Sequence, residues 1–220
     1  MERTRWSCAR GLALVPALIA VVTGVLVLLV LLWKPTPPPR LSQHVTLYPE
    51  PKPLPEFRLI DEHDRDATRD AFGGRWSLVF FGYTHCPDVC PTTLGQMQRL
   101  LRIWRNAPEA GEPPRMVFVT VDPQRDTPQR LATYLDHFGA GFHGLTGERK
   151  EIDRLARAAG AFSRLHEPGE SASGYLVDHS ASITLVDPRS RIVAIFPPPI
   201  DTQRMLADLR EIIRYREEID

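Results

Sequence analysis

Two cysteines, Cys86 and Cys90, are the residues whose type and spacing best support chemistry in this chain. They lie four positions apart, directly after the apolar run at residues 78–81. The only other cysteine, Cys8, precedes a long apolar segment. Two thiols at this spacing can exchange a disulfide or hold a soft metal ion. A purely structural Cys86–Cys90 disulfide is less favoured, because closing so short a loop removes little entropy from the unfolded chain.

Strand and helix patterns alternate around the two thiols. Residues 76–81 and 116–121 are continuous apolar runs typical of buried strands, and apolar residues recur at helical spacing in four stretches: 91–104, 127–138, 152–159 and 202–218. Residues 183–186 and 192–196 flank the turn sequence DPRS and predict a hairpin. This order predicts an α/β protein with helices covering a mixed sheet. A cysteine pair at the first strand-to-helix turn indicates a thioredoxin-like fold.

The predicted helix start at Cys90 matters for either chemistry. A helix amino terminus stabilises a thiolate through its dipole and its unpaired N–H groups, and the thiolate is the reactive and metal-binding species. A metal would need a further ligand, and His179 is the best candidate by context. It lies just before the predicted hairpin, in a loop that borders the first strand-to-helix turn of a thioredoxin-like sheet. A histidine that is only hydrogen-bonded in its loop is the alternative.

Several carboxylates surround these candidate ligands in the sequence. Asp88, Asp122 and Asp178 are candidates for orienting His179 or shaping the site from behind the ligands. Asp126 precedes Thr127 and Pro128 and is expected to serve the turn and the helix cap. His85 is expected at the surface. Met97, Met116 and Met205 fall on apolar patterns, which argues against a methionine-rich metal site.

The amino-terminal part of the chain predicts a membrane anchor. Residues 11–33 form an uncharged run that would span about 35 Å as a helix, against about 30 Å of hydrocarbon. A cleaved signal peptide is the alternative, but its apolar core is usually about 7–15 residues and ends at small residues. The run here ends in LLWKP. We therefore expect a tail at residues 1–10 and a transmembrane helix at 11–33.

The charges beside this helix suggest its orientation. Arg3, Arg5 and Arg10 favour a cytoplasmic tail, which places the rest of the chain outside the cytoplasm, where disulfides persist. An Arg- and Pro-rich composition suits a bacterial source, so we expect a single-pass protein of the bacterial inner membrane with its carboxyl-terminal domain in the periplasm. Residues 34–55 contain eight prolines and predict an extended linker before a domain at 56–220. A formal net charge of zero without a basic cluster gives no support for nucleic-acid binding.

Three motifs together resemble one known family. The strings GYTHCPDVCPTTL at 82–94, VDPQRDTP at 121–128 and VDHS at 177–180 are similar to the signature of the Sco/SenC family. These are membrane-anchored, thioredoxin-like copper proteins that help to deliver copper to the CuA site of cytochrome c oxidase. The resemblance extends from about residue 53 to the final helix. It implies that Cys86, Cys90 and His179 are copper ligands.

The chemistry of these three side chains agrees with that implication. Two thiolates and one imidazole make a soft site that suits Cu(I), with Cu(II) also plausible, whereas structural zinc normally takes four ligands. The resemblance implies the CuA-bearing oxidase subunit as partner, together with other periplasmic copper chaperones or thiol reductants. It describes a chaperone, so an enzymatic activity stays uncertain.

Two other functions use the same features. A thiol-disulfide reductase acting on the oxidase cysteines would need Cys86 and Cys90 but not His179. A copper or redox sensor, or an assembly scaffold, would work mainly through protein contact. A Cys86–Cys90 disulfide would remove both sulfur ligands, so copper binding and redox state are coupled in any of these functions.

Overall fold

The chain divides into two compact units, which are described separately. The computed structural model describes residues 9–32, 37–42, 45–107, 111–161, 163–165, 177–179 and 181–219; side chains at 9–15, 30–32, 163–165 and 177–179 lie outside the description. One unit comprises Met1–Pro39 with Tyr215–Asp220, and the other is Arg40–Arg214. The first contains α1 (Ala9–Leu32). Among the helices described, none has both the length and the apolar character needed to cross a membrane.

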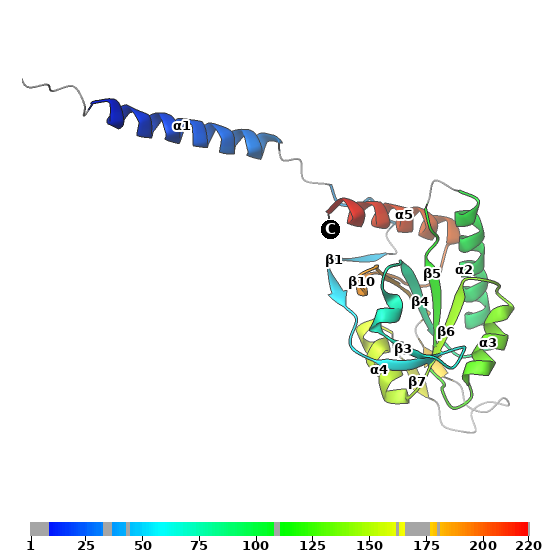
Figure 1. Cartoon of the computed structure of the whole chain (residues 1–220). Helices are drawn as coiled ribbons and strands as arrows, with labels where there is room; N and C mark the ends of the chain where they lie inside the picture. The colour runs from blue at the N-terminus through cyan, green and yellow to red at the C-terminus, as the bar shows by residue number, and fades with distance from the viewer. Residues whose placement is uncertain are drawn as a thin grey trace, which may run out of the picture. The chain divides into compact units, whose positions relative to one another are not determined.

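A mixed eight-stranded sheet forms the centre of the second unit (Figure 1), in the order β1-β10-β9-β4-β5-β6-β2-β3. Strands β4, β5 and β6 are parallel neighbours, and the remaining pairs are antiparallel. A separate pair joins β7 to β8. The mixed sheet predicted from the sequence is therefore confirmed. The strands are β1 (Thr46–Pro53), β2 (Arg58–Asp61), β3 (Asp66–Thr68), β4 (Ser77–Gly82), β5 (Arg115–Thr120), β6 (Phe142–Thr146), β7 (Ser163–Leu165), β8 (Val177–His179), β9 (Ile183–Val186) and β10 (Arg191–Phe196).

The predicted helices are present at the expected places. They are α2 (Val89–Arg105), α3 (Pro128–Asp136), α4 (Arg149–Ala158) and α5 (Thr202–Ile219), with a short 3-10 helix at Arg69–Phe72. Helix α3 begins as the sequence predicted: the Thr127 side chain accepts a hydrogen bond from the Arg130 amide at 3.2 Å, and proline occupies the first turn.

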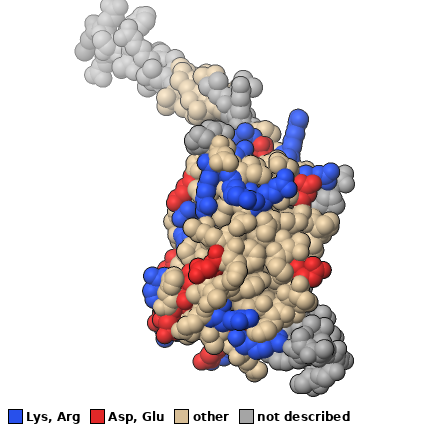
Figure 2. All heavy atoms as spheres, turned by 90° about the vertical axis from the view of Figure 1, so that its right-hand side faces the viewer, with Lys and Arg blue, Asp and Glu red and all other residues tan. Residues whose placement is uncertain are grey.

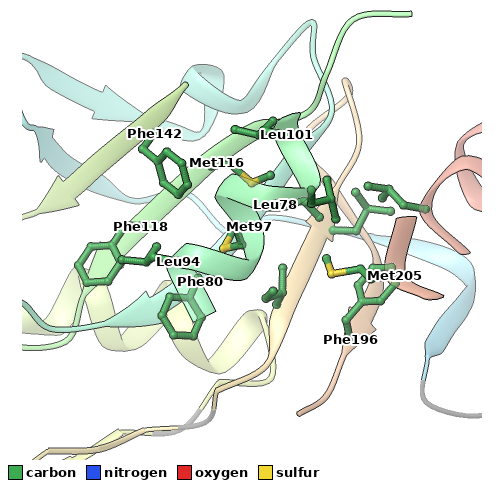
Figure 3. Packing of buried hydrophobic residues seen from close by; sticks show 14 of the residues in the cluster. Leu78, Phe80, Leu94, Met97, Leu101, Met116, Phe118, Phe142, Phe196 and Met205 are labelled. Atoms are coloured by element: carbon green, nitrogen blue, oxygen red, sulfur yellow. The ribbon is translucent and has the colours of Figure 1, made fainter. Parts of the chain in front are cut away.

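Two apolar clusters hold the helices against the sheet. One packs Leu78 and Phe80 of β4 against α2, α3 and α5, and the other packs Val79 and Phe81 against α4. Successive residues of a strand point to opposite faces, so the apolar run at residues 78–81 of β4 serves both clusters. Figure 3 shows three methionines among the leucine and phenylalanine side chains of the first cluster: Met97, Met116 and Met205. Their burial in the core is the outcome predicted for them.

The proline-rich segment differs from its prediction as a linker that buries little. Within residues 34–55, β1 pairs with β10, with Thr46 opposite Ile195 and Lys52 opposite Ile192, and Leu54 is buried. An edge strand forms ladder hydrogen bonds on one side only, so alternate prolines can be accommodated there. The compact unit accordingly begins at Arg40, ahead of the boundary expected at residue 56.

Charged residues of both signs lie on the domain surface. The face in Figure 2 carries a band of Lys and Arg toward its top, and Asp and Glu gather mainly at its sides, leaving a broad central area without charged side chains. Helix α2 contributes three exposed arginines and contains no Asp or Glu: Arg99, Arg102 and Arg105.

Candidate metal and redox centre

Cys86 and Cys90 lie where β4 ends and α2 begins. The Cys86 amide donates to the Tyr83 carbonyl at 3.2 Å, which turns the chain sharply after the strand. The Cys90 amide donates to Cys86 Sγ at 3.4 Å, so the first turn of α2 holds the two cysteines together. The two cysteines are not joined to each other in a disulfide. The pair therefore has the proximity that either disulfide exchange or metal binding requires.

The two thiols occupy different environments. Cys86 is partly exposed and accepts an N–H bond at the helix amino terminus, a position that favours a thiolate. Cys90 is completely buried. Its hydrogen bond with Cys86 and then its burial raise the pKa of the Cys90 thiol well above its ordinary value. Cys86 is thus the more accessible sulfur, and the surroundings of Cys90 disfavour its thiolate form.

Gly82, the last residue of β4, makes room for the buried sulfur. A Cβ atom at this position would lie 2.7 Å from Cys90 Sγ and 2.8 Å from Phe118 Cε2. Both distances are shorter than real Cβ contacts. The absence of a side chain at Gly82 therefore lets α2 bring Cys90 onto the end of the strand.

A buried carboxylate anchors the loop that carries the cysteines. Asp126, with a fully buried side chain, accepts bonds from the Thr84 amide at 3.0 Å, from Thr84 Oγ1 at 2.6 Å and from Thr120 Oγ1 at 2.6 Å. The expectation that Asp126 caps a helix is wrong, because Thr127 is the cap. Asp126 instead ties the end of β5 to the loop after β4.

Two further side chains complete this network. Arg130 of α3 donates from Nε to Thr84 Oγ1 at 3.3 Å. His85 Nδ1 lies 3.2 Å from the same hydroxyl and 3.8 Å from Asp126 Oδ1. The His85 side chain is 38% exposed, as expected for a surface residue. The loop before Cys86 is consequently fixed from both β5 and α3.

The predicted supporting carboxylates have different surroundings. Asp122 is buried and forms an ion pair with Arg125, whose guanidinium lies over the Tyr83 ring at 5.7 Å from its centroid. Asp122 thus supports the turn before Cys86 through Arg125. Asp88 is exposed at the amino terminus of α2, where it accepts a bond from Thr92 Oγ1 at 3.4 Å.

The third predicted ligand falls outside the side-chain description. His179 and Asp178 belong to β8, whose backbone pairs with β7 so that His179 faces Ser163 in register. Their side chains are not described. Among the residues that are described, no three His, Cys, Asp or Glu side chains form a group that could hold a metal. The role of His179 stays a prediction.

Several supporting residues were not found by sequence reasoning. Gly82, Thr84 and Thr120 are ordinary residues for the end of a strand, and their roles depend on contacts from other elements. Gly82 and Thr84 carried a signal, because both lie inside the motif at residues 82–94.

Comparison with known proteins identifies the family. The sequence profile described as SCO1/SenC matches residues 48–214. A protein of Stutzerimonas stutzeri named putative copper-binding protein is 36% identical over 170 residues, which cover 77% of this chain and 81% of that protein. A SCO2-like protein of Rickettsia conorii is 34% identical over 194 residues, covering 87% of this chain and 93% of its own length.

A solved structure agrees with this likeness. The crystal structure of Arabidopsis thaliana ScoI with copper bound matches with a TM-score of 0.67 and 33% identity, covering 73% of this chain and 97% of that one. The mixed sheet, its flanking helices and the order of the elements are therefore those of a thioredoxin-like Sco structure. The chain belongs to the SCO1/SenC family.

Proposed function

We propose that this protein is a copper-binding chaperone that delivers copper to the CuA site of cytochrome c oxidase. Copper would be held by the thiolates of Cys86 and Cys90 and by the imidazole of His179. The observation that carries the proposal is the hydrogen bond from the Cys90 amide to Cys86 Sγ, which keeps the two sulfurs together at a helix amino terminus. Family membership and the copper-bound relative support the choice of metal.

The donor set suits the proposed cargo. Two sulfurs and one nitrogen form a soft, low-coordinate site that matches Cu(I) and accommodates Cu(II). Both thiols must lose their protons to bind, so loading releases protons. The partly exposed Cys86 is the sulfur that a recipient protein would reach first, and transfer would proceed by ligand exchange through a shared thiolate.

Partners and location complete the proposal. The recipient would be the CuA-bearing oxidase subunit, with other periplasmic copper chaperones or thiol reductants acting before it. Residues 11–33 would anchor the protein in a bacterial inner membrane, with the following domain in the periplasm. The uncharged run and the arginines before it are the support for this location. Protease accessibility of the domain in spheroplasts and in inverted vesicles would test it.

A second function, thiol-disulfide reduction, is favoured by the asymmetry of the two thiols. The Cys86 thiolate would attack a client disulfide and release one client sulfur as a thiolate. The buried Cys90 would then lose its proton and attack the sulfur of Cys86, which forms the Cys86–Cys90 disulfide and releases the second client thiolate. Two electrons pass to the client. Exposure of Cys86 and burial of Cys90 fit the attacking and resolving roles.

Copper titration of the reduced protein separates the two functions. We expect His179→Ala to lower Cu(I) affinity by more than about 100-fold, because loss of a ligand should exceed the roughly 10–100-fold effect of losing an outer-shell partner. Competition with a Cu(I)-specific chelator measures this affinity. His137→Ala is the matched control, since His137 is exposed and its Nδ1 bonds to the Thr133 carbonyl one helical turn earlier.

The same pair of variants tests the alternative. Reduction of a disulfide peptide should proceed normally in His179→Ala if the protein is a reductase. Equal copper affinity in the wild type and His179→Ala would remove His179 from the ligand set, and a wild type that binds no copper would refute the chaperone proposal.

A further inference from the structure

A pocket of about 410 Å³ lies beside the second apolar cluster, between the 3-10 helix at Arg69–Phe72 and strands β5 and β6. Its apolar wall includes Phe72, Val117 and Leu145. Arg115 lies two residues before Val117 on β5, so both side chains point to this face of the sheet. Sites for small molecules typically occupy about 300–1,000 Å³ and combine apolar walls with a few polar groups. The pocket has this size and this kind of wall.

Arg75 and Arg115 form a charged wall of the pocket. The Arg115 guanidinium donates to the backbone carbonyls of Ala71 and Gly73. Arg75 donates from Nη2 to the Pro113 carbonyl at 3.0 Å, and its buried Nε has no hydrogen-bond partner among the described residues. A carbonyl oxygen satisfies an N–H group but does not neutralise its charge. The two guanidinium groups therefore bring positive charge to the pocket.

Little negative charge lies beside these two arginines. Glu112 forms an ion pair with Arg75 at 3.1 Å, but the Glu112 side chain is 66% exposed, so water weakens the attraction. Within the part of the chain that the structure describes, no acidic side chain forms an ion pair with Arg115. Burial, and then the nearby charge of Arg75, lower the pKa of Arg115, so its charged form is disfavoured in this environment. An anion in the pocket would offset that penalty.

Other charged side chains of the pocket are already matched or lie in water. Arg65 pairs with Asp61 at 2.7 Å. The buried Glu62 carboxylate accepts a hydrogen bond from the Gly144 amide at 2.8 Å. Asp66 is exposed to solvent. The positive charge that lacks a buried partner is therefore that of the two guanidinium groups at the start of β5.

We propose that this pocket binds a small organic anion in which a carboxylate is attached to an apolar group. The carboxylate lies against the guanidinium groups of Arg75 and Arg115, and the apolar group covers Phe72, Val117 and Leu145. This wall favours such a ligand over an inorganic anion, which would leave the apolar surface in contact with water. Arg115 begins β5, whereas the dithiol follows the end of the parallel neighbour β4, so the inference is independent of the proposed function.

Calorimetric titration of the full-length protein with 3-phenylpropionate tests the inference. We expect saturable binding to the wild type. The uncharged analogue 3-phenylpropanol should bind at least about 10-fold more weakly, because it lacks the charge-assisted hydrogen bonds. Arg115→Gln should weaken binding of 3-phenylpropionate by a similar factor and leave binding of the alcohol unchanged. Arg99→Gln is the matched control, because Arg99 is an exposed arginine of α2.

Ala71→Trp is a second variant that keeps both arginines. Ala71 is exposed and lines the pocket, so a larger ring at this position should fill the space and abolish binding of 3-phenylpropionate. This variant decides the question if Arg115→Gln does not fold. A wild type that does not bind 3-phenylpropionate, or that binds the alcohol or inorganic phosphate equally well, would overturn the proposal. Unchanged binding in Ala71→Trp would also overturn it, because the anion would then bind elsewhere.

Discussion

Gly82→Ala is the substitution that most directly tests how the fold seats Cys90. The new Cβ would lie 2.7 Å from Cys90 Sγ, 2.8 Å from Phe118 Cε2 and 3.2 Å from Phe80 Cε1, whereas ordinary contact begins at 3.4 Å. The sulfur must retreat by about 0.7 Å, in a core whose packing leaves little free volume. Overpacking of this kind costs about 1–3 kcal/mol, offset in part by about 0.4–1 kcal/mol because alanine restricts the unfolded chain.

The expected net loss is about 1–2 kcal/mol in the free energy of unfolding. For a domain of this size it corresponds to a fall in Tm of about 2–8 °C, measurable by thermal denaturation. Copper affinity should fall as well, because binding sites tolerate displacements of only about 0.5 Å. Chelator competition provides that second measurement.

Gly95→Ala is the matched control. Gly95 lies inside α2, and a Cβ there would meet nothing within 4 Å. Alanine should stabilise the helix by up to about 1 kcal/mol and leave copper binding unchanged. If Gly82→Ala were as stable as the wild type and bound copper equally well, Gly82 would not be needed to seat Cys90, and the reasoning would be refuted.

Three further changes test the surroundings of the site and the fold. Asp126→Asn should destabilise the domain by about 1.5–3 kcal/mol in chemical denaturation, because an amide cannot replace all the hydrogen bonds that Asp126 accepts. Asp136→Asn is the control and should be neutral, because Asp136 is exposed. Equal effects of the two substitutions would contradict the anchoring role of Asp126. Thr127→Ala should cost about 1 kcal/mol through loss of the α3 cap, and an unchanged unfolding midpoint would argue against that cap. Burial alone would raise the pKa of Glu62, but hydrogen bonds from His143 and the Gly144 amide lower this pKa below its ordinary value of 4.5. The ionised Glu62 side chain therefore stabilises the folded protein above pH 4.5, and this contribution is lost as the pH falls through the lowered pKa. In Glu62→Gln, the free energy of unfolding should therefore fall less steeply as the pH is lowered below 4.5. Parallel curves of unfolding free energy against pH for the wild type and the variant would exclude this contribution.

The elements that the sequence predicted well are those with a strong local pattern. The apolar run of β4, the amphipathic helices and the Thr127 cap depend on neighbours a few residues away, so their signals are present in the chain itself. Strand β1 was missed because prolines normally exclude a strand, and only the pairing with β10 shows that it lies at an edge. Strand β6 was missed because its pattern is short and interrupted by His143 and Gly144.

By itself the sequence identified the residues proposed to carry the chemistry, two cysteines at the mouth of a buried strand, and the three motifs that together mark the family. The tertiary structure decided how that chemistry is supported. Asp126 anchors the loop before Cys86, and Gly82 admits the sulfur of Cys90. Asp126 and Thr84 are 42 positions apart, and Gly82 also packs against Phe118 of the neighbouring strand β5. These distances follow from how the sheet and helices pack, which no local pattern encodes.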